Sequence, residues 1–290
     1  ASMVKKNLVI TYGKIDGGQF VVRETERGTF AVKEITDQLV RNRKENSGFR
    51  LDVLSLDASG VDFKLLRIDE PRDAGVDFSK MHLIGMDTHI DNLLVKSGGH
   101  VAGDISRLSF VERSGFALSD MSGAFLVDNG QIEVRGAHLQ TELSDINLNY
   151  LLLDGENWEE YKESFVDYVP IICDITESRV SSEDVGYFAP AIWNWKTTVR
   201  NASLAMNGAV ADFEGKITHV TLDDGGVLQG SARVKGLVDV EHTEFDIKVD
   251  KLNASTEEIT YLLSTIAHLS LGESASHYVE RIKGVNASGE

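Results

Sequence analysis

The sequence predicts a mainly β fold: an elongated, curled sheet rich in antiparallel strands, with a few short helices at its joints and a helix near the C-terminus. Apolar and polar residues alternate with a period of two as far as about residue 252, which is the pattern of strands with one buried face. The phase of the alternation changes at Gly, Asn or Asp, where turns and bulges form. The chain has only three prolines, so few strands are barred from the interior of a sheet.

The stretch GFALSDMSGAFLVDNGQIEVRGAHLQ, residues 115–140, predicts two to three strands. Its DNG sequence at residues 128–130 favours a tight hairpin turn. The same alternation recurs in residues 49–68, 225–237 and 243–252, without a fixed repeat length. Several apolar positions between residues 116 and 148 are expected to line an apolar groove on one face of the sheet: Phe116, Leu118, Phe125, Val127, Ile132, Val134, Leu139, Ile146 and Leu148.

Helices are few. Residues 253–266 give the clearest helix, because Ser255 and Glu258 form a capping box before an apolar face. Residues 274–283 indicate a second helix, and residues 157–169 a helical turn or two. Residues 180–190 indicate a short helix capped by Ser181 or Ser182 and stopped at Pro190, whereas residues 31–46 fit a helix or a strand. These helices are too few to cover a sheet of a dozen strands.

The organisation expected is a first β-rich segment, residues 1–155, and a second, residues 156–290, which carries the C-terminal helix. The acidic, aromatic stretch 153–170 separates them as a joint within one continuous sheet. The chain begins without an intact signal peptide and ends without a convincing final element, so we expect an internal fragment of a longer protein.

The composition excludes several classes of protein. A formal net charge of −17 over 290 residues argues against a nucleic-acid partner, which would need clustered Lys and Arg. No stretch reaches the roughly 18 to 20 apolar residues of a membrane-spanning helix. Cys173 is the only cysteine, so an internal disulfide and a multi-cysteine zinc site are excluded. Its apolar neighbours favour a buried structural thiol.

No motif assembles a catalytic, cofactor or metal site. The eight histidines are scattered singly, without the spacing that brings two imidazoles together. Neighbouring carboxylates such as Glu257 and Glu258 face opposite ways on a strand and fit caps or turns. Neither a phosphate-binding glycine loop nor a G-x-S-x-G motif is present. We therefore expect a protein that is not an enzyme and that needs no cofactor.

Trp193 and Trp195 keep an alternative open. Their spacing would place both rings on one side of a strand, where they could stack on a sugar. The alternative is a β-sandwich or β-solenoid module of an adhesin-like surface protein that binds glycan.

The order of short motifs resembles the TamB-like branch of the AsmA-like family, in particular its long versions from Bacteroidetes. The likeness covers roughly residues 50–265 and is carried by degenerate motifs: DFS at 77–79, LSFVERSGF at 108–116, SGAF at 122–125, LQTELSDI at 139–146, SSEDVGYFAP at 181–190, GLVDVEHTEFDIKVDKL at 236–252 and STEEI at 255–259. The family's membrane anchor and C-terminal region are not in the sequence.

The resemblance implies a periplasmic segment of a protein anchored in the inner membrane, with a sheet curled into an apolar trough. It implies carriage of phospholipid between the inner and outer membranes, or help in the assembly of outer-membrane proteins. The implied partners are phospholipid acyl chains and, through regions outside this sequence, an outer-membrane assembly barrel. Physically, an apolar face without helices to cover it has three outcomes: a two-sheet sandwich, a closed barrel, or an open trough that takes acyl chains.

Overall fold

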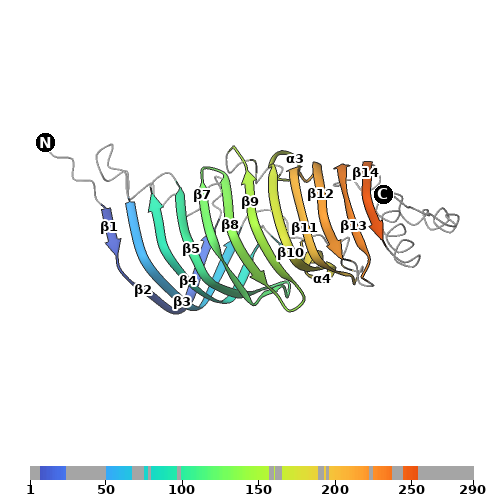
Figure 1. Cartoon of the computed structure of the whole chain (residues 1–290). Coiled ribbons are helices and arrows are strands. Elements are labelled where there is room, and N and C mark those ends of the chain that lie inside the picture. The colour runs from blue at the N-terminus through green and yellow to red at the C-terminus, as the bar shows by residue number, and fades with distance from the viewer. Residues whose placement is uncertain are drawn as a thin grey trace. The chain divides into compact units, whose positions relative to one another are not determined.

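The computed structural model describes residues 7–23, 50–66, 75–77, 80–96, 99–156, 160, 165–188, 193, 196–221, 225–236 and 244–253. Their fold is mainly β, with 77 % strand, and the strands form one large mixed sheet that is not closed (Figure 1). The expected fold class is therefore confirmed. Along the sheet the order is β1-β3-β4-β5-β7-β8-β9-β10-β11-β12-β13-β14, with β2 beside β3 and β6 beside β5.

The strands vary widely in length. Their bounds are β1 Asn7–Ile10, β2 Gly13–Arg23, β3 Arg50–Leu66, β4 His82–Lys96, β5 His100–Glu112, β6 Ala117–Leu118, β7 Asp120–Asp128, β8 Gln131–Gln140, β9 Asp145–Asp154, β10 Ile171–Ser181, β11 Thr198–Ala209, β12 Asp212–Thr221, β13 Val227–Lys235 and β14 Glu244–Asn253. β1 and β2 run parallel to β3. The pairs β3–β4, β4–β5, β5–β7 and β9 to β14 are antiparallel.

The stretch 115–140 forms β6, β7 and β8, as its alternation predicts. The DNG turn is confirmed: Asn129 and Gly130 have φ angles of 39° and 93°. Two successive positive φ angles are typical of the type I′ turn, whose twist matches that of a hairpin.

The two described helices fall inside segments where helices are expected. α3, Phe165–Tyr168, lies in 157–169, and α4, Ser182–Gly186, lies in 180–190. α4 begins with the acidic residues Glu183 and Asp184 in its first turn, which favours a helix N-terminus. The helices expected at 253–266 and 274–283, and the segment 31–46, lie outside the described residues.

The chain forms two compact units. Unit 1 comprises residues 1–129, 137–143 and 183–194, and unit 2 comprises residues 130–136, 144–182 and 195–290. The division at residue 155 stays a prediction.

In unit 1 the long strands bend at glycines whose amides bind carboxylates. Gly60 of β3 and Gly85 of β4 have φ angles of 63° and 60°, and the register of the two strands shifts between Ala58 and Val61. The Gly60 amide donates to Asp87 Oδ1 at 2.8 Å, and the Gly85 amide donates to Asp62 Oδ1 at 3.0 Å. Each strand thus supplies the acceptor for the bulge amide of the other. Figure 1 shows the strong curvature of these strands.

In unit 2 serine hydroxyls accept hydrogen bonds from backbone amides at the bulges. Register shifts occur between Ile175 and Ser178 in β10 and between Arg200 and Ser203 in β11. The Glu177 amide donates to Ser203 Oγ at 3.0 Å. The Asn147 amide donates to Ser178 Oγ at 2.9 Å, and that hydroxyl donates to the Thr176 carbonyl at 2.9 Å. Ser178 is fully buried, so its hydroxyl joins β9 to β10 away from water.

The packing differs from that of a sandwich, in which two facing sheets bury Leu, Ile and Phe completely. Among the described residues, the largest fully buried side chains are those of Val169, Ser144 and Ser178. Leu118 and Leu148 keep 5 % and 8 % of their surface exposed. The described strands belong to one sheet, and its apolar side chains are mostly half-buried.

We expect Ser178→Ala to lower the free energy of unfolding by about 1 to 3 kcal/mol, because both hydrogen bonds of a buried hydroxyl are lost. Urea unfolding measures the change. Ser231→Ala is the matched control: Ser231 pairs with Lys216 in the sheet and is half-buried, so its loss should cost less than about 0.5 kcal/mol. Equal effects of the two substitutions would refute the proposed role of Ser178.

Candidate functional site

The strongest pattern in unit 2 is an apolar face that the strand register defines. Residues that pair across neighbouring strands point to the same side of a sheet. Three rows of such pairs cross β9, β10, β11, β12 and β13, and they contain only apolar residues, one cysteine and glycines. The rows are Leu153, Ile171, Gly208, Phe213 and Val234; Leu151, Cys173, Met206, Gly215 and Ala232; and Leu148, Ile175, Leu204, Ile217 and Gly230. Each row contains one glycine, and the three glycines lie on the adjacent strands β11, β12 and β13.

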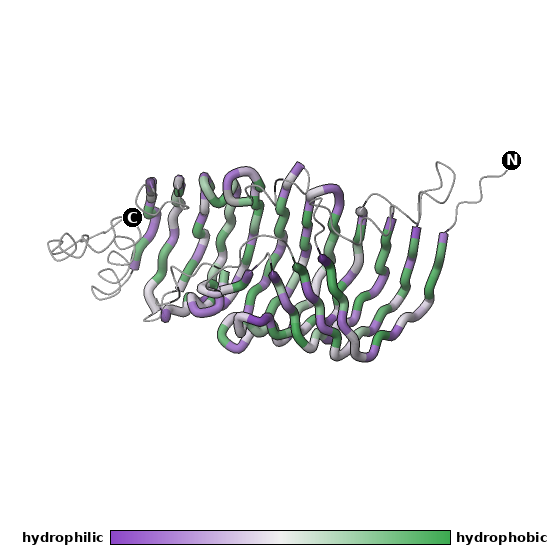
Figure 2. Tube along the Cα trace, turned by 180° about the vertical axis from the view of Figure 1, so that it is seen from behind, coloured by the Kyte–Doolittle hydropathy of each residue, from purple (hydrophilic) through white to green (hydrophobic). Residues whose placement is uncertain are grey.

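The opposite face of unit 2 is mostly polar over β11 to β13. One of its rows begins with Leu152 and Ile172 on β9 and β10 and continues with Asn207, Glu214 and Arg233; the next consists of Tyr150, Asp174, Ala205, Lys216 and Ser231. Arg233 bonds Asp212 through Nε and a terminal nitrogen, both at 3.1 Å. Along β12 exposed polar residues alternate with half-buried Phe213, Gly215 and Ile217. Figure 2 shows this alternation along the strands.

The apolar face of unit 2 carries little cover in the described part of the chain. The only helix wholly within that part of unit 2 is the four-residue α3. A small buried cluster forms around Ala202 and Val220, with Val180, Ile217 and Leu228 packed beside it. The remaining side chains of the rows are mostly half-buried.

Unit 1 repeats this arrangement. One row consists of Gly13, Leu56, Ile90, Ile105 and Gly123, and the row next to it on the opposite face consists of Lys14, Asp57, His89 and Arg107. A Cβ on Gly103 would lie 3.1 Å from both the Ile90 and the Phe125 side chains. Glycine at this position therefore leaves room for both on the apolar side.

Part of the apolar face of unit 1 is covered by residues 183–188 and 193. Their aromatic side chains, with Phe110 of β5 and Phe116 of the β5–β6 turn, form the aromatic cluster: Phe110, Phe116, Tyr187, Phe188 and Trp193. The Phe116 ring centroid lies 5.7 Å from that of Tyr187 and 5.0 Å from that of Phe188, and Tyr187 and Trp193 are 4.6 Å apart. These are edge-to-face and tilted contacts typical of packed aromatic rings.

Two hydrogen bonds hold α4 and Tyr187 against the rest of unit 1. The Val76 amide donates to the Tyr187 carbonyl at 2.7 Å, and Thr141 Oγ1 donates to Asp184 Oδ2 at 2.6 Å. A Cβ on Gly186 would lie 2.9 Å from Trp193 Cα, so only glycine allows this approach. In the same region of unit 1, Val76 and Leu118 are buried.

The nine residues expected on one face are divided between the units. In unit 1, Phe116 belongs to the aromatic cluster, Leu118 pairs with Phe110, and Phe125 lies beside Ile90. Val127 pairs with Val101, and Leu139 is half-buried. In unit 2, Leu148 belongs to an apolar row with Ile146 two residues before it, and Ile132 and Val134 flank Glu133 in β8. Their role in lining a groove stays a prediction.

Trp193 lies outside the strands and is half-buried against Tyr187. The expectation that it faces one side of a strand is therefore wrong: the ring packs inside the aromatic cluster. Trp195 lies outside the described residues.

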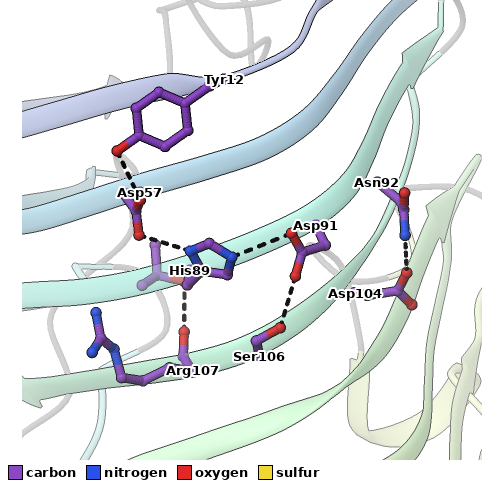
Figure 3. Close-up of polar contacts among 9 residues, drawn as sticks. Tyr12, Asp57, His89, Asp91, Asn92, Asp104, Ser106 and Arg107 are labelled. Atoms are coloured by element: carbon purple, nitrogen blue, oxygen red, sulfur yellow. Dashed lines mark hydrogen bonds and ion pairs between the residues drawn. The ribbon is translucent and has the colours of Figure 1, made fainter.

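A polar cluster occupies the opposite face of unit 1 (Figure 3). His89 Nδ1 lies 2.7 Å from Asp57 Oδ1, and Nε2 lies 3.2 Å from Asp91 Oδ1. Tyr12 Oη donates to the other oxygen of Asp57 at 2.9 Å, and Ser106 Oγ donates to the other oxygen of Asp91 at 2.9 Å. The cluster thus joins the residues just before β2 to β3, β4 and β5.

The charges within the cluster shift its pKa values in opposite directions. The hydrogen bond to Asp57 raises the pKa of His89; burial opposes this effect, and the charge of Asp91 adds to it. The hydrogen bonds from His89 and Tyr12 lower the pKa of Asp57.

The cluster lacks the parts of a nucleophilic site. Both imidazole nitrogens bind carboxylates, and Ser106 donates to Asp91 rather than to His89, so no hydroxyl faces a free base. Burial raises the pKa of the Cys173 thiol, which disfavours the reactive thiolate. Within the described ranges, no group of three His, Cys, Asp or Glu side chains could hold a metal ion.

Sequence reasoning missed this cluster because its members come from three strands. The available signal was the i, i+2 spacing of His89 and Asp91, which places both side chains on one face of a strand. It also missed the cover provided by residues 183–188 and 193, which depends on contacts with residues more than 60 positions away, such as Phe116.

The described part of the chain contains no helix long and apolar enough to cross a membrane. No protein-family model, curated protein or solved structure matches the chain. The family resemblance stays a prediction.

We expect Phe116→Ala to lower the free energy of unfolding by about 2 to 3 kcal/mol, because the ring packs against two aromatic side chains of the covering segment. Chemical denaturation followed by tryptophan fluorescence measures the change. Phe20→Ala is the matched control: Phe20 is 54 % exposed and stacks on Phe63, so its loss should cost about 1 kcal/mol or less. A similar loss in both variants would contradict the packing role of Phe116.

Proposed function

We propose that this chain binds phospholipid acyl chains on the apolar face of its sheet. The observation that carries the proposal is the set of three rows on one face of β9 to β13, in which all fifteen positions hold apolar residues, glycine or Cys173. A face of this size normally packs against a second layer. Within the described part of the chain the strands lie in one sheet and the side chains of the rows are mostly half-buried, which suits an apolar ligand.

The chemistry of the rows favours an acyl chain over a polar ligand. A sugar or nucleotide site needs convergent hydrogen-bonding groups among its apolar contacts. The rows provide aliphatic and aromatic carbon, one thiol and glycine, and the charged side chains of the same strands point the other way. An acyl chain gains about 0.8 kcal/mol per buried methylene on such a wall, whatever the order of Leu, Ile and Val.

The proposed context is that of the family the sequence resembles: a periplasmic segment of a TamB-like envelope protein anchored in the inner membrane. There, acyl-chain binding would serve phospholipid carriage between the two membranes or the assembly of outer-membrane proteins. The motifs that support this context lie on both sides of the apolar rows, at LQTELSDI before them and GLVDVEHTEFDIKVDKL after them.

Photo-crosslinking tests the proposal directly. The purified chain is incubated with phosphatidylethanolamine that carries a diazirine in one acyl chain, and the adducts are mapped by mass spectrometry after irradiation. We expect adducts on row residues such as Leu204, Met206 and Ile217, and none on Ala205, Asn207 or Lys216 of the opposite face. Adducts spread equally over both faces, or none, would overturn the proposal.

Two neighbouring substitutions provide the matched comparison. Leu204→Asp places a carboxylate in an apolar row, whereas Ala205→Asp places the same group on the polar face, at an exposed position paired with Lys216. We expect Leu204→Asp to reduce crosslinking at least about tenfold, since losing contact with two methylenes costs about 1.6 kcal/mol. Ala205→Asp should match the wild type. Circular dichroism establishes that both variants are folded before they are compared.

A further inference from the structure

We propose that His89 is a pH-sensitive latch that holds the edge of the sheet, β1 and β2, against β3. The latch consists of Tyr12, Asp57, His89 and Asp91 (Figure 3). It lies on the face of unit 1 opposite the row of Gly13, Leu56, Ile90, Ile105 and Gly123 and does not depend on acyl-chain binding.

The edge is held from one side in the described part of the chain. β1 and β2 pair only with β3 there, and seven large apolar side chains on this edge are exposed: Leu8, Val9, Ile10, Tyr12, Ile15, Phe20 and Val21. An edge strand with this much exposed apolar surface is held mainly by its backbone ladder. Specific side-chain contacts to β3 therefore contribute to holding this edge in place.

Tyr12 makes the shortest of the side-chain hydrogen bonds found between this edge and β3. It lies in the break between β1 and β2, and its hydroxyl donates to Asp57 at 2.9 Å. The bond from Ser59 to Asp16 is longer, at 3.5 Å. Asp57 thus links the edge to His89 on β4.

The contacts of His89 are both satisfied when both ring nitrogens carry hydrogen. Each nitrogen faces a carboxylate oxygen, at 2.7 Å on Asp57 and 3.2 Å on Asp91. A neutral imidazole has one N–H donor and one acceptor nitrogen. Loss of the proton would turn one of the two contacts into a repulsion between lone pairs.

The charged groups around His89 do not restore the interaction that is lost when His89 loses its proton. Asp57 faces His89 from β3, Asp91 lies on the same strand as His89, and Arg107 pairs with it from β5. Lys14 pairs with Asp57 from β2 but forms an ion pair with Asp16, at 3.8 Å. Asp104 pairs with Asp91 from β5. Neutral His89 would leave Asp57, Asp91 and Asp104 on adjacent strands, with Arg107 paired with His89 from β5.

The direction of the pH effect follows from the signs of the shifts. Asp57 raises the pKa of His89 above its ordinary 6.5, so the stabilising contact is fully present below pH 6.5 and is lost as the pH rises through the raised value. The pKa of Asp57 lies below its ordinary 3.8, so the carboxylate stays charged down to that region. The latch is therefore closed in mildly acidic solution and opens in alkaline solution.

Hydrogen exchange of the whole chain at pH 6.0 and pH 8.5, corrected for intrinsic exchange rates, tests the latch. We expect the protection of residues 13–23 to fall about three- to tenfold at the higher pH. In His89→Gln this pH dependence should disappear. In Tyr12→Phe, protection at pH 6.0 should fall to the alkaline level while His89 and both carboxylates remain.

His100→Gln is the matched control. His100 also bonds a carboxylate, Asp128 at 2.9 Å, but it lies on β5 and does not contact the edge. This variant should keep the pH dependence of residues 13–23. No pH dependence in the wild type, an unchanged one in His89→Gln, or its loss in His100→Gln would each overturn the proposal.

Discussion

The constraint on which this structure depends is the need to bend long strands without leaving backbone amides unpaired. A bulge interrupts the ladder and frees an N–H group, which needs an acceptor. In unit 1 the acceptors are Asp62 and Asp87, each on the strand opposite the bulge it serves. In unit 2 they are serine hydroxyls, and that of Ser178 is fully buried. The two units solve the same problem with charged and uncharged groups.

The bulges also keep each face uniform. An extra residue in a strand would move every later side chain to the other side, but the alternation in this sequence changes phase where the strands bulge. Leu56 and Ala58 precede the bulge of β3 at Gly60, and Val61 and Phe63 follow it, so the apolar parity changes from even to odd. The apolar face therefore continues through the bend, and the polar residues stay on the opposite face, where His89 contacts Asp57 and Asp91.

The period-two pattern was sufficient to predict the mainly β sheet, and local signals predicted the hairpin at residues 128–130 and helices within 157–169 and 180–190. These features depend on local sequence: alternation, a turn that accepts positive φ, and a serine cap at a helix start. The packing of Tyr187 and Phe188 against Phe116 and the partners of His89 could not be predicted from the sequence, because both depend on strand register and on distant segments. Trp193 illustrates the limit, since its spacing from Trp195 suggested a strand, whereas packing against Tyr187 decides its position.

The three glycines in the apolar rows of unit 2 form a diagonal. Gly208, Gly215 and Gly230 lie on successive strands, and each is one row further along. A Cβ on Gly208 would lie 2.7 Å from Phe213 Cα, and one on Gly230 would overlap the Lys248 carbonyl oxygen, whereas one on Gly215 would have no atom nearer than 3.9 Å. At Gly208 and Gly230 the missing side chain therefore lets the backbone of the neighbouring strand approach closely. A side chain at either position would push β11 from β12 or β13 from β14, so these glycines preserve the strand pairing that keeps the apolar rows side by side.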